Sequence, residues 1–164
     1  MHIYFSEAGA AHFYSACAAI ALGFAVLLLR KGTRAHRAIG LLYGFTMLSV
    51  NASALMLYHL TGHFGVFHFL ALISLFCVVW GVSAAIFRWK SWLNSHYRGM
   101  SFSYLGLLAA ACAEAMVRVP ALHVHTPSLA IAIGVGISFA FALGGGIVIN
   151  RLKPRVLANF AATS

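Results

Sequence analysis

A short basic segment, RKGTRAHR at residues 30–37, separates two long apolar segments near the beginning of the chain. A helix of about 20 apolar residues, rising about 1.5 Å per residue, is long enough to cross the hydrocarbon core of a bilayer. Loops rich in Lys and Arg remain on the cytoplasmic side of a membrane. The segment therefore predicts two antiparallel transmembrane helices joined by a cytoplasmic loop, and it sets the direction of every helix that follows.

The composition supports this prediction. Of 164 residues, 62% are hydrophobic and 8% are charged, Glu7 and Glu114 are the two acidic residues, and the mean hydropathy is +0.92. These values are typical of a polytopic membrane protein. The formal charge of +9 comes from basic clusters between apolar segments, which predicts contact with anionic lipid headgroups and excludes a nucleic-acid partner.

Five apolar segments predict an all-α integral membrane protein with five transmembrane helices in one helical-bundle domain covering residues 1–164. The predicted spans are residues 10–29, 38–60, 64–87, 100–119 and 128–149. Ten of the eleven Lys and Arg residues fall on one side of this arrangement, and Arg118 falls on the other. The excess predicts that the N-terminus lies outside and the C-terminus in the cytoplasm, in a multi-pass protein of the bacterial inner membrane. The run Gly144-Gly145-Gly146 lies inside the last span and predicts close helix packing or a bend there.

Polar residues near the outer ends of the spans form the first candidate site. Glu114 and Arg118 are four residues apart on the fourth span, so they can form an ion pair that orients the helix or takes part in function. His12, His59 and His68 also lie near the outer end, and with Glu114 they form a predicted zinc or copper site. His59 and His63 have the spacing of helical ligands if the second helix extends that far. The alternative is that the loop histidines are solvated interface residues, whereas His68 has apolar neighbours and needs a partner.

Two histidines at the inner ends of the second and fourth spans form the second candidate site. His36 and His96 begin helices that run in the same direction, so we expect them at similar depth. Each is followed closely by an arginine and then by a tyrosine about two turns deeper: Arg37 and Tyr43, and Arg98 and Tyr104. Two such imidazoles would be the axial ligands of a haem b whose propionates the arginines neutralise, or they would hold a quinone headgroup. The alternative is a His-Arg anchor that binds lipid headgroups.

These motifs resemble a bacterial membrane-protein family known as domain of unknown function 2306. The resemblance covers about residues 34–118. The motifs that carry it are His36-Arg37-x-x-Gly40-x-x-Tyr43 with Met47, Phe67-His68, and His96-x-Arg98-x-Met100 with Tyr104 and Arg118. It implies a small helical inner-membrane protein without assigning an activity, and it directs attention to His36, Arg37, His68, His96, Arg98 and Arg118.

Three functions follow as hypotheses. The first is membrane electron transfer with haem b or quinone, as a component of an oxidoreductase that meets a membrane redox partner or a second copy of the chain. One observation weighs against it, because His36 and His96 lie near the predicted edge of the hydrocarbon. The second is an outer-face metal-binding protein or enzyme, and the third is a non-catalytic membrane subunit or lipid-binding scaffold. No Ser-His-Asp set, phosphate loop or paired-carboxylate site appears in the sequence, which argues against a hydrolase.

Overall fold

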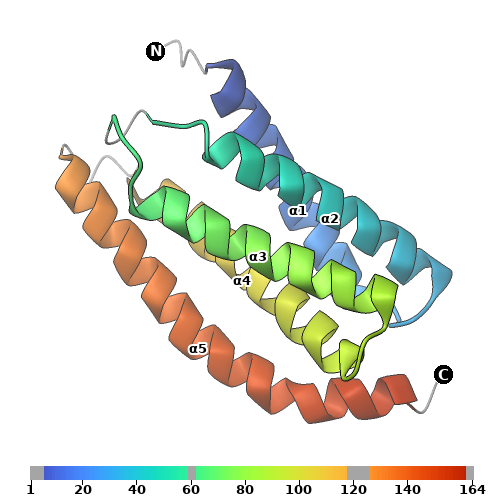
Figure 1. Ribbon diagram of the computed structural model, residues 1–164. Helices are drawn as coiled ribbons and strands as arrows, with labels where there is room; N and C mark the ends of the chain where they lie inside the picture. Colours follow the sequence, from blue (N-terminus) through green and yellow to red (C-terminus); the bar gives the residue numbers. More distant parts are fainter. Residues whose placement is uncertain (1–5, 59–61, 118–125, 162–164) are drawn as a thin grey trace. The chain divides into compact units, whose positions relative to one another are not determined.

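The structure is a computed structural model that describes residues 6–58, 62–117 and 126–161. These residues form five helices and no strand: α1 (Glu7–Leu28), α2 (Arg34–Ala54), α3 (Val66–Phe87), α4 (Trp92–Val117) and α5 (Pro127–Ala161) (Figure 1). The predicted all-α membrane fold is confirmed. The contacts divide the chain into two compact units, Met1–Phe76 and Cys77–Ser164, so that α3 contributes to both.

Four of the helices, α1, α3, α4 and α5, are long and apolar enough to cross a membrane. The exception is α2, whose second half contains Asn51 and Ser53. These two side chains are only 2% and 6% exposed, so they do not face lipid. A polar residue in a membrane helix faces protein or water rather than lipid. Five crossings and an external N-terminus therefore remain predictions, which require α2 to cross with its polar side chains turned inward.

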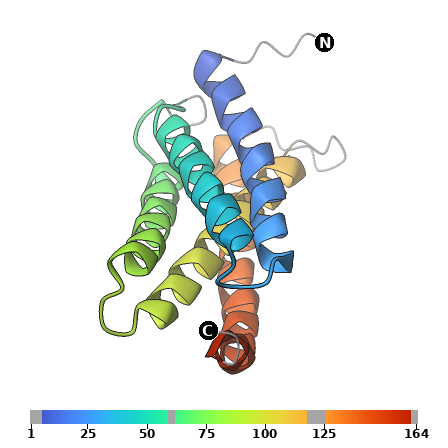
Figure 2. The same ribbon diagram turned by 90° about the vertical axis from the view of Figure 1, so that its right-hand side faces the viewer.

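In the first unit, α1 and α2 are neighbours that run in opposite directions (Figure 1 and Figure 2). A hydroxyl caps the start of each helix: Ser6 Oγ accepts from the N–H of Gly9 at 3.1 Å, and Thr33 Oγ1 accepts from the N–H of His36 at 3.2 Å. The turn between the helices is held by Lys31, whose Nζ donates to the carbonyl oxygens of Val26, Leu27 and Leu29 at 2.8, 2.9 and 3.2 Å. Its positive charge satisfies carbonyls at the negative end of α1.

The second helix ends at Ala54 rather than near the predicted residue 60. Near this end, Asn51 Nδ2 donates to the carbonyl of Met47, and Ser53 Oγ donates to that of Ser49, both at 2.7 Å. Such side chains compete with the backbone for helix carbonyls. The N–H of Met56 then bonds only three residues back, to the carbonyl of Ser53 at 3.0 Å, which tightens and ends the helix. His63 consequently lies outside any helix, so the helical spacing considered for His59 and His63 does not occur there.

In the second unit, the last part of α3 packs closely on α4. A Cβ atom at Gly99 of α4 would lie 2.7 Å from both the Cα of Gly81 and the carbonyl oxygen of Cys77 on α3. The two backbones can approach in this way only because both crossing residues lack side chains. The fourth helix begins at Trp92, eight residues before the predicted span at residues 100–119. His96 is therefore inside the helix, on its second turn, and within the candidate membrane span Trp92–Met116.

The fifth helix packs on α4 through the predicted glycine run. A Cβ at Gly145 would overlap the side chain of Leu105, whereas one at Gly144 would meet nothing within 4 Å. Close packing is thus the role of Gly145 in particular. Farther along, Pro154 lies inside α5 and cannot donate to the carbonyl of Asn150, which removes one helical hydrogen bond. Figure 1 shows α5 bending toward its C-terminal end.

Candidate functional site

The imidazole of His96 connects two helices of the second unit. Its Nδ1 lies 2.9 Å from the carbonyl oxygen of Gly81 on α3. Because a carbonyl oxygen can only accept, Nδ1 carries the ring proton and the lone pair of the neutral ring is on Nε2. Histidines that bind metals have the same arrangement, in which a hydrogen bond at one nitrogen fixes the tautomer and orients the other.

The crossing of the two glycines explains why this contact forms. Gly99 lies one turn beyond the start of the His96 motif and brings the α4 backbone against Gly81. On the same side, a Cβ at Gly81 would lie 3.0 Å from the Sδ and the backbone nitrogen of Met100. The backbone separation is therefore small enough for the imidazole to reach the carbonyl of Gly81.

The two residues after His96 contact α5 instead. Tyr97 donates from its hydroxyl to the carbonyl oxygen of Ile149 at 2.8 Å, and Arg98 Nη2 lies 3.4 Å from Oδ1 of Asn150. Both acceptors lie one turn before Pro154, where the helical hydrogen bonding is interrupted. Three consecutive residues thus connect α4 to α3 on one side and to α5 on the other. The predicted site residue Tyr104 lies farther along α4 and is partly buried.

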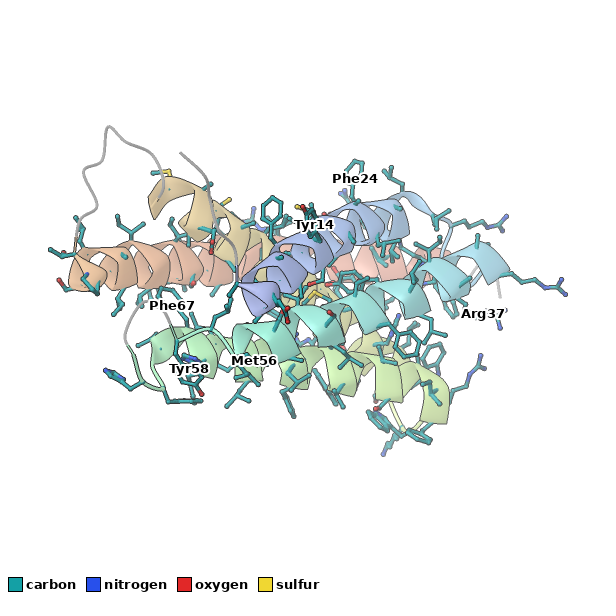
Figure 3. The ribbon with its side chains drawn as sticks, turned by 90° about the horizontal axis from the view of Figure 1, so that it is seen from above. Tyr14, Phe24, Arg37, Met56, Tyr58 and Phe67 are labelled. Atoms are coloured by element: carbon teal, nitrogen blue, oxygen red, sulfur yellow. The ribbon has the colours of Figure 1, made fainter. Side chains whose placement is uncertain are left out.

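The other predicted residues of the inner site belong to the first unit. His36 and Arg37 lie in the first turn of α2; Arg37 is exposed (Figure 3), and His36 is partly buried. Tyr43 is 2% exposed and is one of the largest fully buried side chains. Because His36 and His96 belong to different units, their pairing on one cofactor stays a prediction from the sequence.

His68 has the most unusual surroundings of the outer residues. It is the third residue of α3 and is 4% exposed. Its Nδ1 accepts a hydrogen bond from the N–H of Gly65 at 3.2 Å, so the ring proton is on Nε2. In the part of the chain that the structure describes, this buried Nε2 has no hydrogen-bond partner. A buried donor left in this way costs about 1–3 kcal/mol.

Two aromatic rings cover the same imidazole. The ring centroid of Tyr58 lies 4.6 Å from that of His68 with an interplanar angle of 31°, and that of Phe64 lies 5.0 Å away at 29°. Figure 3 shows Tyr58 beside the start of α3. Both aromatic residues remain well exposed on their other sides, Tyr58 by 44% and Phe64 by 54%.

The predicted metal site is only partly within the described residues. His12 Nδ1 lies 3.2 Å from both the carbonyl oxygen of Val50 and Oγ of Ser53, so its ring connects α1 with α2. Glu114 is exposed on α4, and both His59 and Arg118 lie outside the described residues. Over residues 6–58, 62–117 and 126–161, no group of three or more His, Cys, Asp or Glu side chains is arranged to hold a metal ion. The metal site and the Glu114-Arg118 pair stay predictions.

His96 and His68 are predicted from the sequence, whereas the groups that they contact are not. Gly81 and Gly99 carried a usable signal, because a glycine within a helix costs about 1 kcal/mol relative to alanine and marks a close helix contact in membranes. The carbonyl of Ile149 gave no signal in the sequence, because every residue has a backbone carbonyl.

The sequence of the chain also matches a known protein family. The sequence model of the family described as "Predicted membrane protein (DUF2306)" matches residues 9–151. No curated protein and no solved structure matches the chain.

Proposed function

The chain belongs to the family described as "Predicted membrane protein (DUF2306)" and is a multi-pass membrane protein, and we propose that it transfers electrons within the membrane by binding haem b through His96. One observation carries the proposal, the hydrogen bond between His96 Nδ1 and the carbonyl oxygen of Gly81. It orients the ring and leaves the lone pair on Nε2, which is the nitrogen that would ligate iron.

The position of His96 supports the same assignment. The histidine lies in the second turn of α4, within the candidate span Trp92–Met116. Its partner Gly81 lies within the candidate span Val66–Phe87. A bound haem would supply one-electron redox chemistry, because its iron can be ferric or ferrous. The contribution of this chain is to hold the imidazole rigidly and, through the Gly81 carbonyl, to increase its basicity.

The haem content of the purified protein tests the proposal. The protein is expressed with sufficient haem and purified in detergent, and its oxidised and reduced absorption spectra and pyridine haemochrome are recorded. We expect a b-type haem in the wild type and its loss in His96→Ala. His63→Ala is the matched control, since His63 lies outside any helix, and it should keep the haem.

A colourless wild-type protein contradicts the proposal. That result would favour the non-catalytic subunit or lipid-binding scaffold, in which His96 only fixes the contact between α3 and α4.

A further inference from the structure

We propose that His68 donates a hydrogen bond from Nε2 to the carbonyl oxygen of an amphipathic molecule that lies in the membrane. This site at the start of α3 goes beyond the proposed function and does not rest on it. His68 lies about 20 Å along α3 from Gly81 at a rise of about 1.5 Å per residue, so it is remote from the His96 contact.

The tautomer of His68 determines which kind of ligand atom the ring can bind. The N–H of Gly65 occupies the lone pair of Nδ1, and the proton is therefore on Nε2. A metal ion would need a lone pair on Nε2, whereas an acceptor oxygen needs the proton that is there. The Nε2 group is buried and has no hydrogen-bond partner within the described residues, which is rare for a native buried donor and points to a partner beyond those residues.

The neighbouring sequence argues against an anionic ligand. Between residues 55 and 87 the sequence contains no Lys or Arg that could neutralise one. Burying a phosphate or carboxylate beside an uncharged donor, without a cation, would be unfavourable. A neutral carbonyl oxygen requires only the single hydrogen bond that His68 supplies.

The position of His68 favours an amphipathic ligand over a water-soluble one. Val66–Phe87 is a candidate span with a hydropathy of 2.4, and His68 lies in its first turn, near the boundary between hydrocarbon and headgroups. Phe64 and Phe69 are 54% and 59% exposed there and offer apolar surface to an acyl or isoprenoid chain. Carbonyl groups of this kind occur both in quinone rings and in phospholipid esters.

Nitrogen NMR of the histidine rings tests the proposal on the full-length chain. The protein is labelled with ¹⁵N-histidine in dodecyl maltoside, a detergent without a carbonyl group. His68 is assigned by comparison with His68→Phe. We expect a protonated Nε2 whose resonance moves when decylubiquinone is added, and a decylubiquinone dissociation constant at least tenfold weaker in His68→Phe. If the Nε2 resonance moves in phosphatidylcholine nanodiscs without quinone, the proposal is supported and the carbonyl oxygen is that of a lipid ester.

A conservative variant separates lost binding from lost folding. His68→Gln keeps an N–H donor, so it should retain more of the decylubiquinone binding than His68→Phe. Three results would overturn the proposal: a proton on Nδ1, an Nε2 resonance unchanged by both quinone and lipid, or replacement of the Nε2 proton by added Zn²⁺.

Discussion

The Nδ1 atom of His96 lies 2.9 Å from the carbonyl oxygen of Gly81, and this hydrogen bond joins α4 to α3 where two glycines meet. The orientation of the imidazole therefore depends on how closely Gly99 approaches Gly81. A change that separates the two backbones would affect stability and also the nitrogen that we propose as an iron ligand.

Replacing Gly99 by alanine should destabilise the protein. The added Cβ would lie 2.7 Å from the Cα of Gly81 and from the carbonyl oxygen of Cys77, and backbone atoms cannot rotate away. Overpacking of this kind costs about 1–3 kcal/mol. A lower thermal unfolding midpoint of Gly99→Ala in detergent is the expected result.

Gly106→Ala is the matched control, because a Cβ at Gly106 on the same helix meets nothing within 4 Å. Replacing a helical glycine by alanine is ordinarily stabilising by about 0.5–1 kcal/mol. Equal midpoints for the two variants would show that the glycine crossing does not hold α3 and α4 together.

Tyr97→Phe should weaken the contact between α4 and α5. It removes only the hydroxyl that donates to the carbonyl oxygen of Ile149 at 2.8 Å, and such a bond contributes about 0.5–1.5 kcal/mol. Unfolding in increasing SDS would measure the loss. Tyr14→Phe, at a position that is 71% exposed, should leave the transition unchanged. If both variants behaved alike, the Tyr97 hydroxyl would have no role in this contact.

His12→Ala should loosen the pair of α1 and α2. The ring nitrogen Nδ1 lies 3.2 Å from the carbonyl oxygen of Val50 and from Oγ of Ser53, whereas Ser15 Oγ bonds the carbonyl of Ala11 on its own helix. We expect a loss of about 1 kcal/mol for His12→Ala and a smaller effect for Ser15→Ala, by the same SDS titration. The reverse order would mean that His12 does not connect the helices.

Single cysteines can determine whether α2 crosses the membrane. Cys17, Cys77 and Cys112 are first replaced by serine, and a cysteine is then placed at exposed Arg30 before α2 or at exposed His63 after it. If α2 crosses, a membrane-impermeant maleimide will label intact cells at residue 63 and will label residue 30 only after permeabilisation. Labelling of both positions from the same side would contradict five crossings.

The helical fold was predictable because apolar segments and basic stops are local signals. The predicted span at residues 10–29 corresponds closely to α1 (Glu7–Leu28). The end of α2 was not predictable from hydropathy, since residues 55–58 are apolar and the helix ends in backbone hydrogen bonds from Met56 and Leu57 to carbonyls only three residues back. The helix α4 begins eight residues before the predicted span at residues 100–119, because a helix can begin in polar residues that hydropathy excludes from a span.

The residues of the candidate sites could be predicted from the sequence, but the contacts that these residues make could not. His96 was identified by its motif, but its tautomer depends on Gly81, which approaches it through helix packing. For His68 the apolar neighbours correctly indicated a buried imidazole that needs a partner. Which nitrogen needs it follows from the turn at Gly65, a detail of backbone geometry.

Imidazole rescue of His96→Ala is the most direct test of the proposed iron ligand. We predict that the wild-type protein, expressed with sufficient haem, has the absorption spectrum of a b-type haem. His96→Ala should lack this spectrum, and haem added together with imidazole should restore it, because imidazole can occupy the space left by the side chain. A His96→Ala variant that keeps the wild-type spectrum without imidazole, or a wild type with no Soret band, would contradict the account.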